Sequence, residues 1–323
     1  MKFAKVLKLT AFAAALATAS AAFADNEVII YTNADEEAQV AMKHALDANG
    51  FEGKYLMQSW GTSELGGRLM AEGRNIEADV LTLSSYYLDS VQQKDKVFKD
   101  LTFDHTTIKG DTVPYYAPIL GVTGSMFVNT EVLKEFNLPA PKALKDLADP
   151  QYEGYISVPD ITGSSTSWLM TQALVQAYGE EEGIKLVQAI ERNAGDHLEL
   201  SGSAPLKKIR AGEVAVGFGL RHQAVADKKR GLPIDYIDPA EGNYTITEAV
   251  AVVDKGENTN PDAMAVAECI IKHARTELLT NYPVALYPGE SVDEDLRPAN
   301  PQTFKEKLTV ELLKRHQDLV KGE

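Results

Sequence analysis

The stretch APILGVTGSMFVN at residues 117–129 decides how we expect this chain to fold. It reads as one continuous β-strand of about twice the usual five or six residues. Gly121 and Gly124 lie in its middle, where residues without a side chain allow the strand to bend. A strand of this length is able to cross from one domain into another. We therefore expect two domains that share it.

The segments on either side of this stretch repeat one pattern, in which a short apolar strand leads through a polar loop into a helix. This pattern is typical of βαβ units and a mainly parallel sheet. A later apolar strand, EAVAVVD, stands alone and is interpreted as a return crossing. The repeated strands are EVIIYTN (27–33), KYLMQSW (54–60) and ADVLTLSS (78–85) before the stretch, and YISVPD (155–160), LELS (198–201) and EVAVGFG (213–219) after it.

The expected fold class is α/β, with two lobes that each hold a mainly parallel sheet flanked by helices. We predict that residues 25–121 and about 245–290 form the first lobe, and that residues 122–244 form the second. Helices within residues 291–323 are expected to pack on the second lobe or across both lobes. Ligands bind beyond the carboxyl ends of parallel strands, and these ends would face each other across a cleft. The alternative is one large doubly wound domain.

Residues 1–24 have the features of a secretory signal peptide. A basic start, MKFAKVLK, precedes an apolar run, and AAFA at residues 21–24 places small residues before the cleavage position. We expect the mature chain to begin near Asp25 and to be a soluble protein of the periplasm. Cys269 is the one cysteine of the chain, which excludes an intramolecular disulfide.

The charge of the chain restricts its partners. The net charge is −15, and the expected signal peptide is basic, so the mature chain is more acidic still. Such a surface repels nucleic acid and anionic membranes, and we expect neither as a partner. An anionic ligand must therefore be held by local donors rather than by the overall field.

Polar loops rich in Ser, Thr, Gly and Asn stand directly before most of the predicted helices. Hydroxyls and N–H groups at a helix N-terminus form an anion site, and small residues let the backbone approach closely. Ordinary helix capping explains any single loop, but TGSSTS at residues 162–167 holds more hydroxyls than one cap needs. The candidate ligand-binding residues in these loops are Thr32, Asn33, Trp60, Thr62, Ser63, Ser84, Ser85, Thr162, Gly163, Ser164, Ser165, Thr166 and Ser203.

Arg221 and His222 end an apolar strand in AVGFGLRHQAV at residues 215–225. A guanidinium matches phosphate and carboxylate oxygens in a bidentate manner, so we predict that Arg221 is an oxyanion ligand. Its alternative role is an ion pair with an acid such as Glu248 that locks the fold. For His222 we consider three roles: a neutral hydrogen-bond donor, a titrating ligand and a residue that begins a helix.

Motifs for catalysis are missing from the chain. It has no G-x-S-x-G, no Walker loop and no H-E-x-x-H, and its six histidines show no paired ligand spacing. We therefore predict a binding protein that is not an enzyme and needs no metal and no cofactor.

Four stretches resemble successive landmarks of the periplasmic substrate-binding proteins of ABC transporters. They are VIIYTNADEEAQVAMKHAL (28–46), GTSELGGRLMAEGRNIEADVLTLSS (61–85), GVTGSMFVNTEVL (121–133) and SGSAPLKKIRAGEVAVGFG (201–219). The resemblance is to the branch that holds the ferric-ion, thiamine, 2-aminoethylphosphonate and sugar-phosphate binders. It implies the two-lobed type II fold, a hinge that closes the lobes over the ligand, and docking on an inner-membrane permease. We expect the chain to act as a monomer.

Ferric-ion members of this branch typically carry a Tyr-Tyr pair where this chain has Arg221 and His222. The resemblance therefore favours a small anionic solute, either a phosphonate such as 2-aminoethylphosphonate or a phosphate ester. An amine on this ligand is expected to face Asp35, Glu36 or Glu241, each of which is otherwise explained as a solvated surface carboxylate. The alternatives are a ferric-ion binder that uses a synergistic anion and other tyrosines, an exported phosphate-ester hydrolase, and a sensor subunit.

Overall fold

The computed structural model describes residues 27–322, so the predicted signal peptide lies outside the described residues. The strands are β1 (Val28–Thr32), β2 (Tyr55–Ser59), β3 (Val80–Ser84), β4 (Ala117–Asn129), β5 (Ile156–Pro159), β6 (Leu198–Glu199), β7 (Val216–Leu220), β8 (Ile234–Ile237) and β9 (Thr245–Val252). The α-helices are α1 (Glu36–Leu46), α2 (Thr62–Glu72), α3 (Ser85–Asp95), α4 (Thr130–Glu135), α5 (Ser165–Tyr178), α6 (Glu180–Ala194), α7 (Ala204–Arg210), α8 (Arg221–Lys229), α9 (Ala263–Cys269), α10 (Arg275–Asn281) and α11 (Val310–Lys321).

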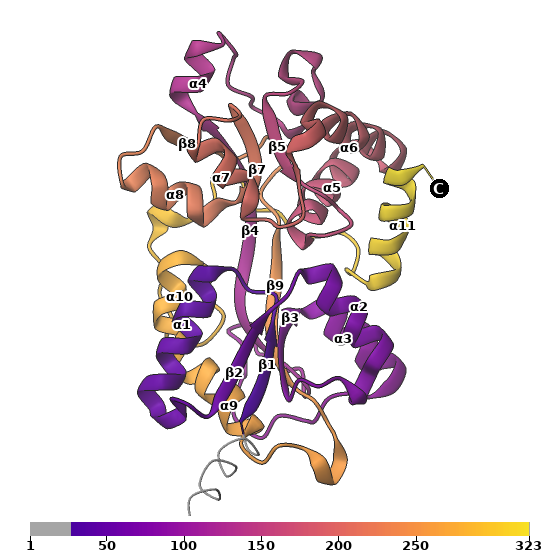
Figure 1. Ribbon diagram of the computed structural model, residues 1–323, viewed down its shortest axis with the longest axis vertical. Coiled ribbons are helices and arrows are strands. Elements are labelled where there is room, and N and C mark those ends of the chain that lie inside the picture. The colour runs from indigo at the N-terminus through magenta and orange to yellow at the C-terminus, as the bar shows by residue number, and fades with distance from the viewer. Residues whose placement is uncertain (1–26, 323) are drawn as a thin grey trace, which may run out of the picture.

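These elements form two lobes, one above the other in Figure 1. Lobe 1, below, holds β1 to β3 with α1 to α3, α9 and α10, and lobe 2, above, holds β5 to β8 with α4 to α8. β1 pairs in parallel with β2 and β3, and β5 pairs in parallel with β6 and β7. All antiparallel pairings between the named strands involve β4 or β9. The strand order is β2-β1-β3-β9-β4-β7-β5-β6, with β8 beside β4.

The long strand β4 belongs to both lobes. Its first half, from Ala117 to Thr123, pairs with β9. Its second half, from Gly124 onward, pairs with β7 and β8 in lobe 2. The two-lobed α/β prediction is confirmed, and the alternative of one large domain is wrong. The residue boundaries between the lobes stay a prediction.

The two glycines of β4 are required by close packing against neighbouring side chains. A Cβ atom on Gly121 would lie 2.8 Å from Cγ2 of Thr245, and one on Gly124 would lie 2.5 Å from the ring of Phe218. Real Cβ atoms do not approach other atoms this closely, so a larger residue would push the crossing strands apart. The sequence predicted that these glycines let the strand bend, and the structure adds this steric reason for them.

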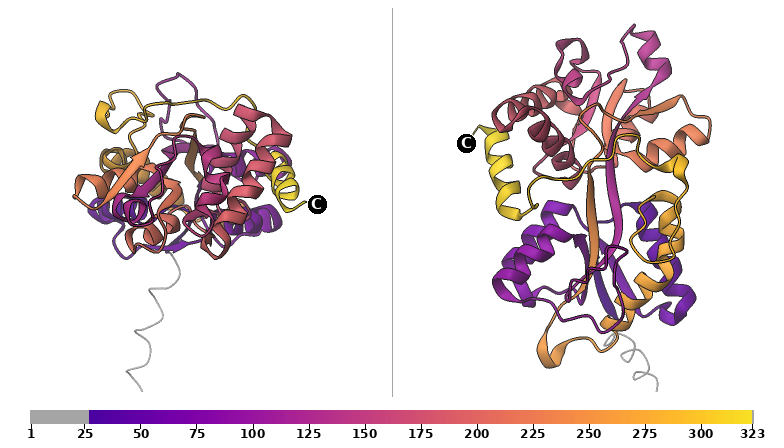
Figure 2. Two further views of the ribbon diagram at one scale, coloured as in Figure 1. Left: turned by 90° about the horizontal axis from the view of Figure 1, so that it is seen from above. Right: turned by 180° about the vertical axis from the view of Figure 1, so that it is seen from behind.

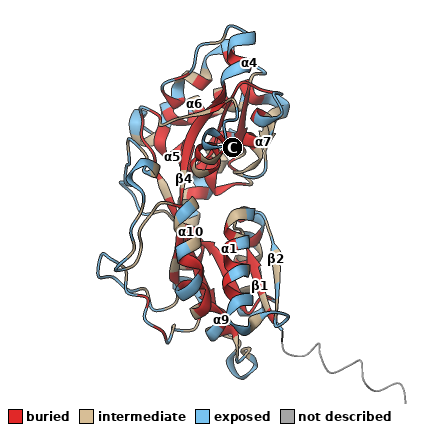
Figure 3. Cartoon of the chain, turned by 90° about the vertical axis from the view of Figure 1, so that its left-hand side faces the viewer, coloured by how far each residue is buried: buried red, intermediate tan, exposed pale blue. Residues whose placement is uncertain are grey.

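The buried residues follow the strands and the helix faces that cover them, while the outer helix faces are exposed (Figure 3). This arrangement leaves the loops at the strand ends to meet between the lobes. Within residues 27–322, we find no helix with both the length and the apolarity that crossing a membrane requires.

The C-terminal helix α11 contacts both lobes. It packs beside α6 and α3, at the side of the molecule in both Figure 1 and Figure 2. The backbone N–H of Val310 donates to Ser90 of α3 at 3.3 Å, and Gln317 donates to the carbonyl of Ile161 in lobe 2 at 2.9 Å. In the core beneath it, the indole N–H of Trp168 donates to Nδ1 of His316 at 3.0 Å.

Because His316 accepts this buried hydrogen bond from Trp168, we predict that the protein loses stability in acid. Burial lowers the pKa of His316, and the carboxylate of Glu180 opposes this shift without reversing it. The unfolded chain therefore takes up the proton first as the pH falls below about 6.5, which favours unfolding by up to about 1.4 kcal/mol per pH unit. Urea unfolding at pH 7.5 and 5.5 gives the free energy of unfolding at each pH. Between these two pH values it should fall more in the wild type than in His316→Gln. Equal losses in both proteins would contradict this role.

Candidate functional site

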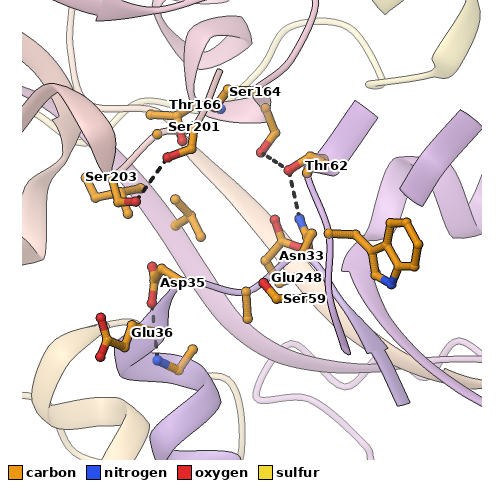
Figure 4. A pocket seen from close by; sticks show the side chains of 18 of the residues that line it. Asn33, Asp35, Glu36, Ser59, Thr62, Ser164, Thr166, Ser201, Ser203 and Glu248 are labelled. Atoms are coloured by element: carbon orange, nitrogen blue, oxygen red, sulfur yellow. Dashed lines mark hydrogen bonds between the residues drawn. The ribbon is translucent and has the colours of Figure 1, made fainter. Parts of the chain in front are cut away.

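A cavity of about 450 Å³ lies between the lobes, at the carboxyl ends of the parallel strands. The loops after β1 and β2 line it from lobe 1, and residues 163–166 and 200–203 line it from lobe 2. Glu248 of β9 also lines it, from the pair of strands that joins the lobes. Figure 4 shows these side chains converging on one space from both lobes. The position is the one expected for a ligand site in this type of sheet.

Hydroxyl groups from both lobes meet on one side of the cavity. Ser164 caps α5, where its Oγ accepts a hydrogen bond from the N–H of Thr166 at 3.2 Å. Oγ of Ser165 lies 3.5 Å from Oγ1 of Thr62, the first residue of α2 in lobe 1. Oγ of Ser201 lies 3.1 Å from Oγ of Ser203. Two helix N-termini with their partial positive charge thus face this space, which favours an anion there.

Carboxylates line the cavity as well as hydroxyls. Glu248 is buried, its Oε1 accepts a hydrogen bond from Ser84 at 2.7 Å, and burial raises its pKa to about 7. Asp35 caps α1, and burial raises its pKa although His222 opposes the shift. Glu36 and Glu64 line the cavity as well. Among the described lining residues, Lys207 is the one with a cationic side chain.

Half of the residues predicted from the sequence come together at this cavity. The predicted residues that line it are Asn33, Trp60, Thr62, Gly163, Ser164, Ser165, Thr166 and Ser203. Those that do not line it are Thr32, Ser63, Ser84, Ser85, Thr162, Arg221, His222 and Glu241.

Several of the residues outside the lining hold the site together instead. Thr32 is fully buried, and its hydroxyl accepts hydrogen bonds from Thr82 and from the N–H of Ala34. Ser84 donates to Glu248 and so orients that carboxyl group. The N–H of Ser63 donates to the carbonyl of Gly163 at 3.3 Å, which is a contact between the two lobes. Ser85 begins α3, and Thr162 lies in the turn before α5.

Arg221 does not line this cavity but, with His222, a second one of about 320 Å³, so its role as an oxyanion ligand stays a prediction. Its guanidinium pairs with Asp238 through two bonds of 2.7 and 3.0 Å, and it also donates to the carbonyls of Leu296 and Arg297. The residue is 4% exposed. Its five donors are therefore largely used within the fold. The alternative role as a structural ion pair describes it, although the partner is Asp238 and not Glu248.

His222 lies in a contact between the lobes, outside the cavity. Its Nε2 is 3.8 Å from Oδ2 of Asp35, its ring packs on Tyr282, and burial lowers its pKa. Beside it, Gln223 donates to both oxygens of Glu37 at 3.0 Å. Donor atoms of Asp35, Glu37 and His222 lie within 4.8 Å of one another, a spacing that would also suit a metal ion. Nε2 of His222 is buried and has no hydrogen-bond partner among the described residues.

Glu241 is also placed away from the cavity. Its carboxylate accepts hydrogen bonds from the N–H groups of Leu144 and Lys145 and from the hydroxyl of Tyr178. It therefore caps the short helical turn Leu144–Ala148, so it is not free to receive an amine. Asp35 and Glu36, the other two acids expected to face an amine, do line the cavity.

Several lining residues were not predicted from the sequence, and Glu248 is the most important of them. It lies within an apolar strand, where a single acid gives no signal of a binding role. Ser59 and Ser201 also line the cavity, and they lie within two residues of the predicted residues Trp60 and Ser203. Lys207 lies about one helical turn after the predicted residue Ser203, in α7, and this spacing is the signal that could have found it.

Comparison with known proteins gives the family context for this cleft. Residues 75–306 match the sequence model of a family described as bacterial extracellular solute-binding protein. An uncharacterized protein of Haemophilus influenzae is 28% identical over 140 residues, which is 43% of this chain and 40% of that protein. The aligned region is therefore less than half of that relative.

Solved structures share the fold. AfuA of Actinobacillus pleuropneumoniae, a periplasmic binding protein with fructose-6-phosphate bound, superposes with a TM-score of 0.73 at 20% identity, over 90% of this chain and 96% of AfuA. Iron-bound HitA of Pseudomonas aeruginosa gives a TM-score of 0.67 at 18% identity, over 92% of this chain and 99% of HitA. The family match spans well over half of the chain and fits its two lobes and central cleft. The chain therefore belongs to the bacterial extracellular solute-binding proteins.

Proposed function

We propose that this protein is the periplasmic solute-binding component of an ABC importer. It captures a small anionic organic solute, a phosphonate or a phosphate ester, by hinge closure and delivers it to an inner-membrane permease without catalysis. The observation that supports this most is the meeting of the α2 and α5 N-termini, with their hydroxyls, on one cavity from opposite lobes. A ligand that bridges both groups stabilises the closed arrangement, because it binds the open one less well.

Local donors take the place of the arginine clamp in this proposal. Thr62, Ser165 and Thr166 offer hydroxyls, and Lys207 supplies a charge at the edge of the cavity. Hydrogen bonds to an ionised partner contribute about 1.5–3 kcal/mol each. A few of them supply the roughly 8 kcal/mol that a micromolar affinity requires.

Titration calorimetry with a panel of phosphonates, phosphate esters and ferric salt tests the proposal. We expect saturable binding of a phosphonate or phosphate ester and no release of inorganic phosphate. Ferric binding with a visible charge-transfer band would favour the iron alternative, and turnover of an ester would favour the hydrolase. Tyr86 with Tyr87 and Tyr115 with Tyr116 pack against each other outside the cavity lining, which gives the iron alternative little support.

Lys207 gives a specific prediction for the anionic end of the ligand. Replacement of Lys207 by Met should weaken binding of the anionic ligand about five- to tenfold, because one exposed charge-assisted hydrogen bond is lost. Lys208→Met is the matched control, since Lys208 is the next residue and pairs with Glu213 at 2.7 Å, away from the cavity. Calorimetric dissociation constants for the two variants make the comparison. An equal loss of affinity in both variants would mean that Lys207 acts only through the overall charge of the protein and not through a contact with the ligand.

A further inference from the structure

Two buried acceptor atoms at the cavity have no partner among the described residues. They are Oε2 of Glu248 and Oδ1 of Asn33. Glu248 is 5% exposed, and both residues line the cavity. Their side chains lie close together at the centre of Figure 4, on the lobe 1 side. Buried polar atoms almost always have a partner, so each such atom at a ligand site marks a place where the ligand supplies one.

The other polar atoms of these two side chains are already engaged. Oε1 of Glu248 accepts from Ser84 at 2.7 Å, and Nδ2 of Asn33 donates to Thr62 at 3.0 Å. What remains free is therefore an acceptor in both cases. The indole N–H of Trp60 is also unpartnered, but its ring packs against Tyr31 and the guanidinium of Arg68. The two free atoms are both acceptors, so a hydrogen-bond donor on the ligand would satisfy them.

The charges of the lining point to the same kind of group. Asp35, Glu36, Glu64 and Glu248 line the cavity with a single cationic side chain, Lys207. A ligand that is only an anion would leave these carboxylates without compensation, and their repulsion would oppose its binding. A ligand with a cationic group near Glu248 would remove this cost.

We infer that the ligand is a zwitterion, and that Glu248 and Asn33 form the subsite that receives its protonated amine. This inference rests on the proposed function, in which the hydroxyls of α2 and α5 hold the anionic end. Glu248 is then a specificity-determining residue, which selects amine-bearing solutes over analogues with the same anionic group. Ser84 acts as a positioning residue, because it fixes one oxygen of the carboxyl group and leaves the other to the ligand.

The subsite also couples binding to a proton. Burial raises the pKa of Glu248 to about 7, with the neighbouring side chains of Ser84 and Asn33 opposing the shift and the charge of Asp35 adding to it. Tyr86 is the other titratable group close enough to sense this carboxyl group. A bound ammonium group favours the ionised form, so binding releases a proton when the pH is below about 7. Affinity should therefore rise with pH through this range and level off above it.

The test compares three ligands that differ in one group: 2-aminoethyl, 2-hydroxyethyl and ethyl compounds, each as the phosphonate and as the phosphate monoester. The wild type should bind the aminoethyl compound at least about 30-fold more tightly than the ethyl one. In Glu248→Gln this preference should fall to within about threefold, while the affinity for the ethyl compound should not decrease, because one repelling carboxylate is removed. Glu64→Gln is the matched control, because Glu64 lines the cavity on an exposed position and should keep the wild-type preference.

A pH series supplies a second readout. For the aminoethyl ligand, the ratio of the dissociation constants at pH 6 and pH 8 is measured for the wild type and for Glu248→Gln. The wild-type ratio divided by the Glu248→Gln ratio should be about ten. This division cancels the ionisation of the ligand itself. Equal affinity of the wild type for all three ligands, or a preference for the hydroxyethyl compound, would overturn the zwitterion inference alone. Failure of every ligand to bind would refute the proposed function, and the inference with it.

Discussion

Replacement of Asp238 by Ala is expected to lower the free energy of unfolding by about 3–5 kcal/mol, because it leaves the buried guanidinium of Arg221 without its counter-charge. The two side chains are 5% and 9% exposed. Asp238 also accepts from the N–H of Ala299 at 2.9 Å and from Asn243 at 2.9 Å. One carboxylate thus joins α8, the end of β8 and the C-terminal segment. Its loss affects all three at once.

Asp235→Ala is the matched control for this change. Asp235 lies three residues away on β8 and pairs with Lys228 at 2.6 Å, but the two side chains are 42% and 50% exposed. An exposed ion pair contributes less than about 1 kcal/mol. Urea unfolding monitored by circular dichroism gives both free energies. Similar losses in the two variants would show that the Arg221 pair is not a buried structural contact.

Replacement of Arg221 by Met distinguishes a structural role of this residue from a role in ligand binding. Under the structural role, Arg221→Met lowers stability, while the folded fraction binds ligand within about threefold of the wild type. Under the clamp role expected from the sequence, the affinity itself would fall well over tenfold. Calorimetry below the unfolding temperature of the variant distinguishes the two outcomes.

The sequence predicted the fold well because its signals are local. Short apolar strands, polar loops and helix starts repeat along the chain, and each is specified by neighbouring residues. Hydroxyl-rich loops after strands also predicted eight of the cavity residues, since carboxyl ends of parallel strands meet at one edge. The crossing between lobes was also predictable, because the continuous apolar run of β4 at residues 117–129 is itself a local signal.

The sequence failed where a role depends on residues far apart in the chain. Arg221 meets Asp238 and the carbonyls of Leu296 and Arg297, and no pattern near position 221 announces these partners. Glu248 reads as one acid in an apolar strand, and only the pairing of β9 with β3 and β4 places it at the cleft. In both cases tertiary packing decides whether a charge is satisfied within the protein or left for a ligand.

Closure of the lobes depends on small side chains at the rim of the cavity. Thr62 of lobe 1 and Ser165 of lobe 2 place their hydroxyls 3.5 Å apart, and the N–H of Ser63 reaches the carbonyl of Gly163 at 3.3 Å. These contacts leave no room for a large residue between α2 and α5. A bulky side chain at this point therefore favours a more open arrangement, in which the ligand contacts fewer groups. The apparent affinity falls in proportion to the fraction of closed protein.

Ser165→Trp is accordingly expected to weaken ligand binding by more than about 100-fold, because an indole cannot fit against Thr62 while the lobes are closed. Ser165→Ala removes only the hydroxyl and should cost less than about tenfold. Calorimetry measures both affinities, and small-angle scattering should show the Trp variant with a larger radius of gyration than the wild type when ligand is added. Thermal unfolding without ligand checks that the variant is folded. Binding of Ser165→Trp within about threefold of the wild type would show that the ligand is held without closure across α2 and α5.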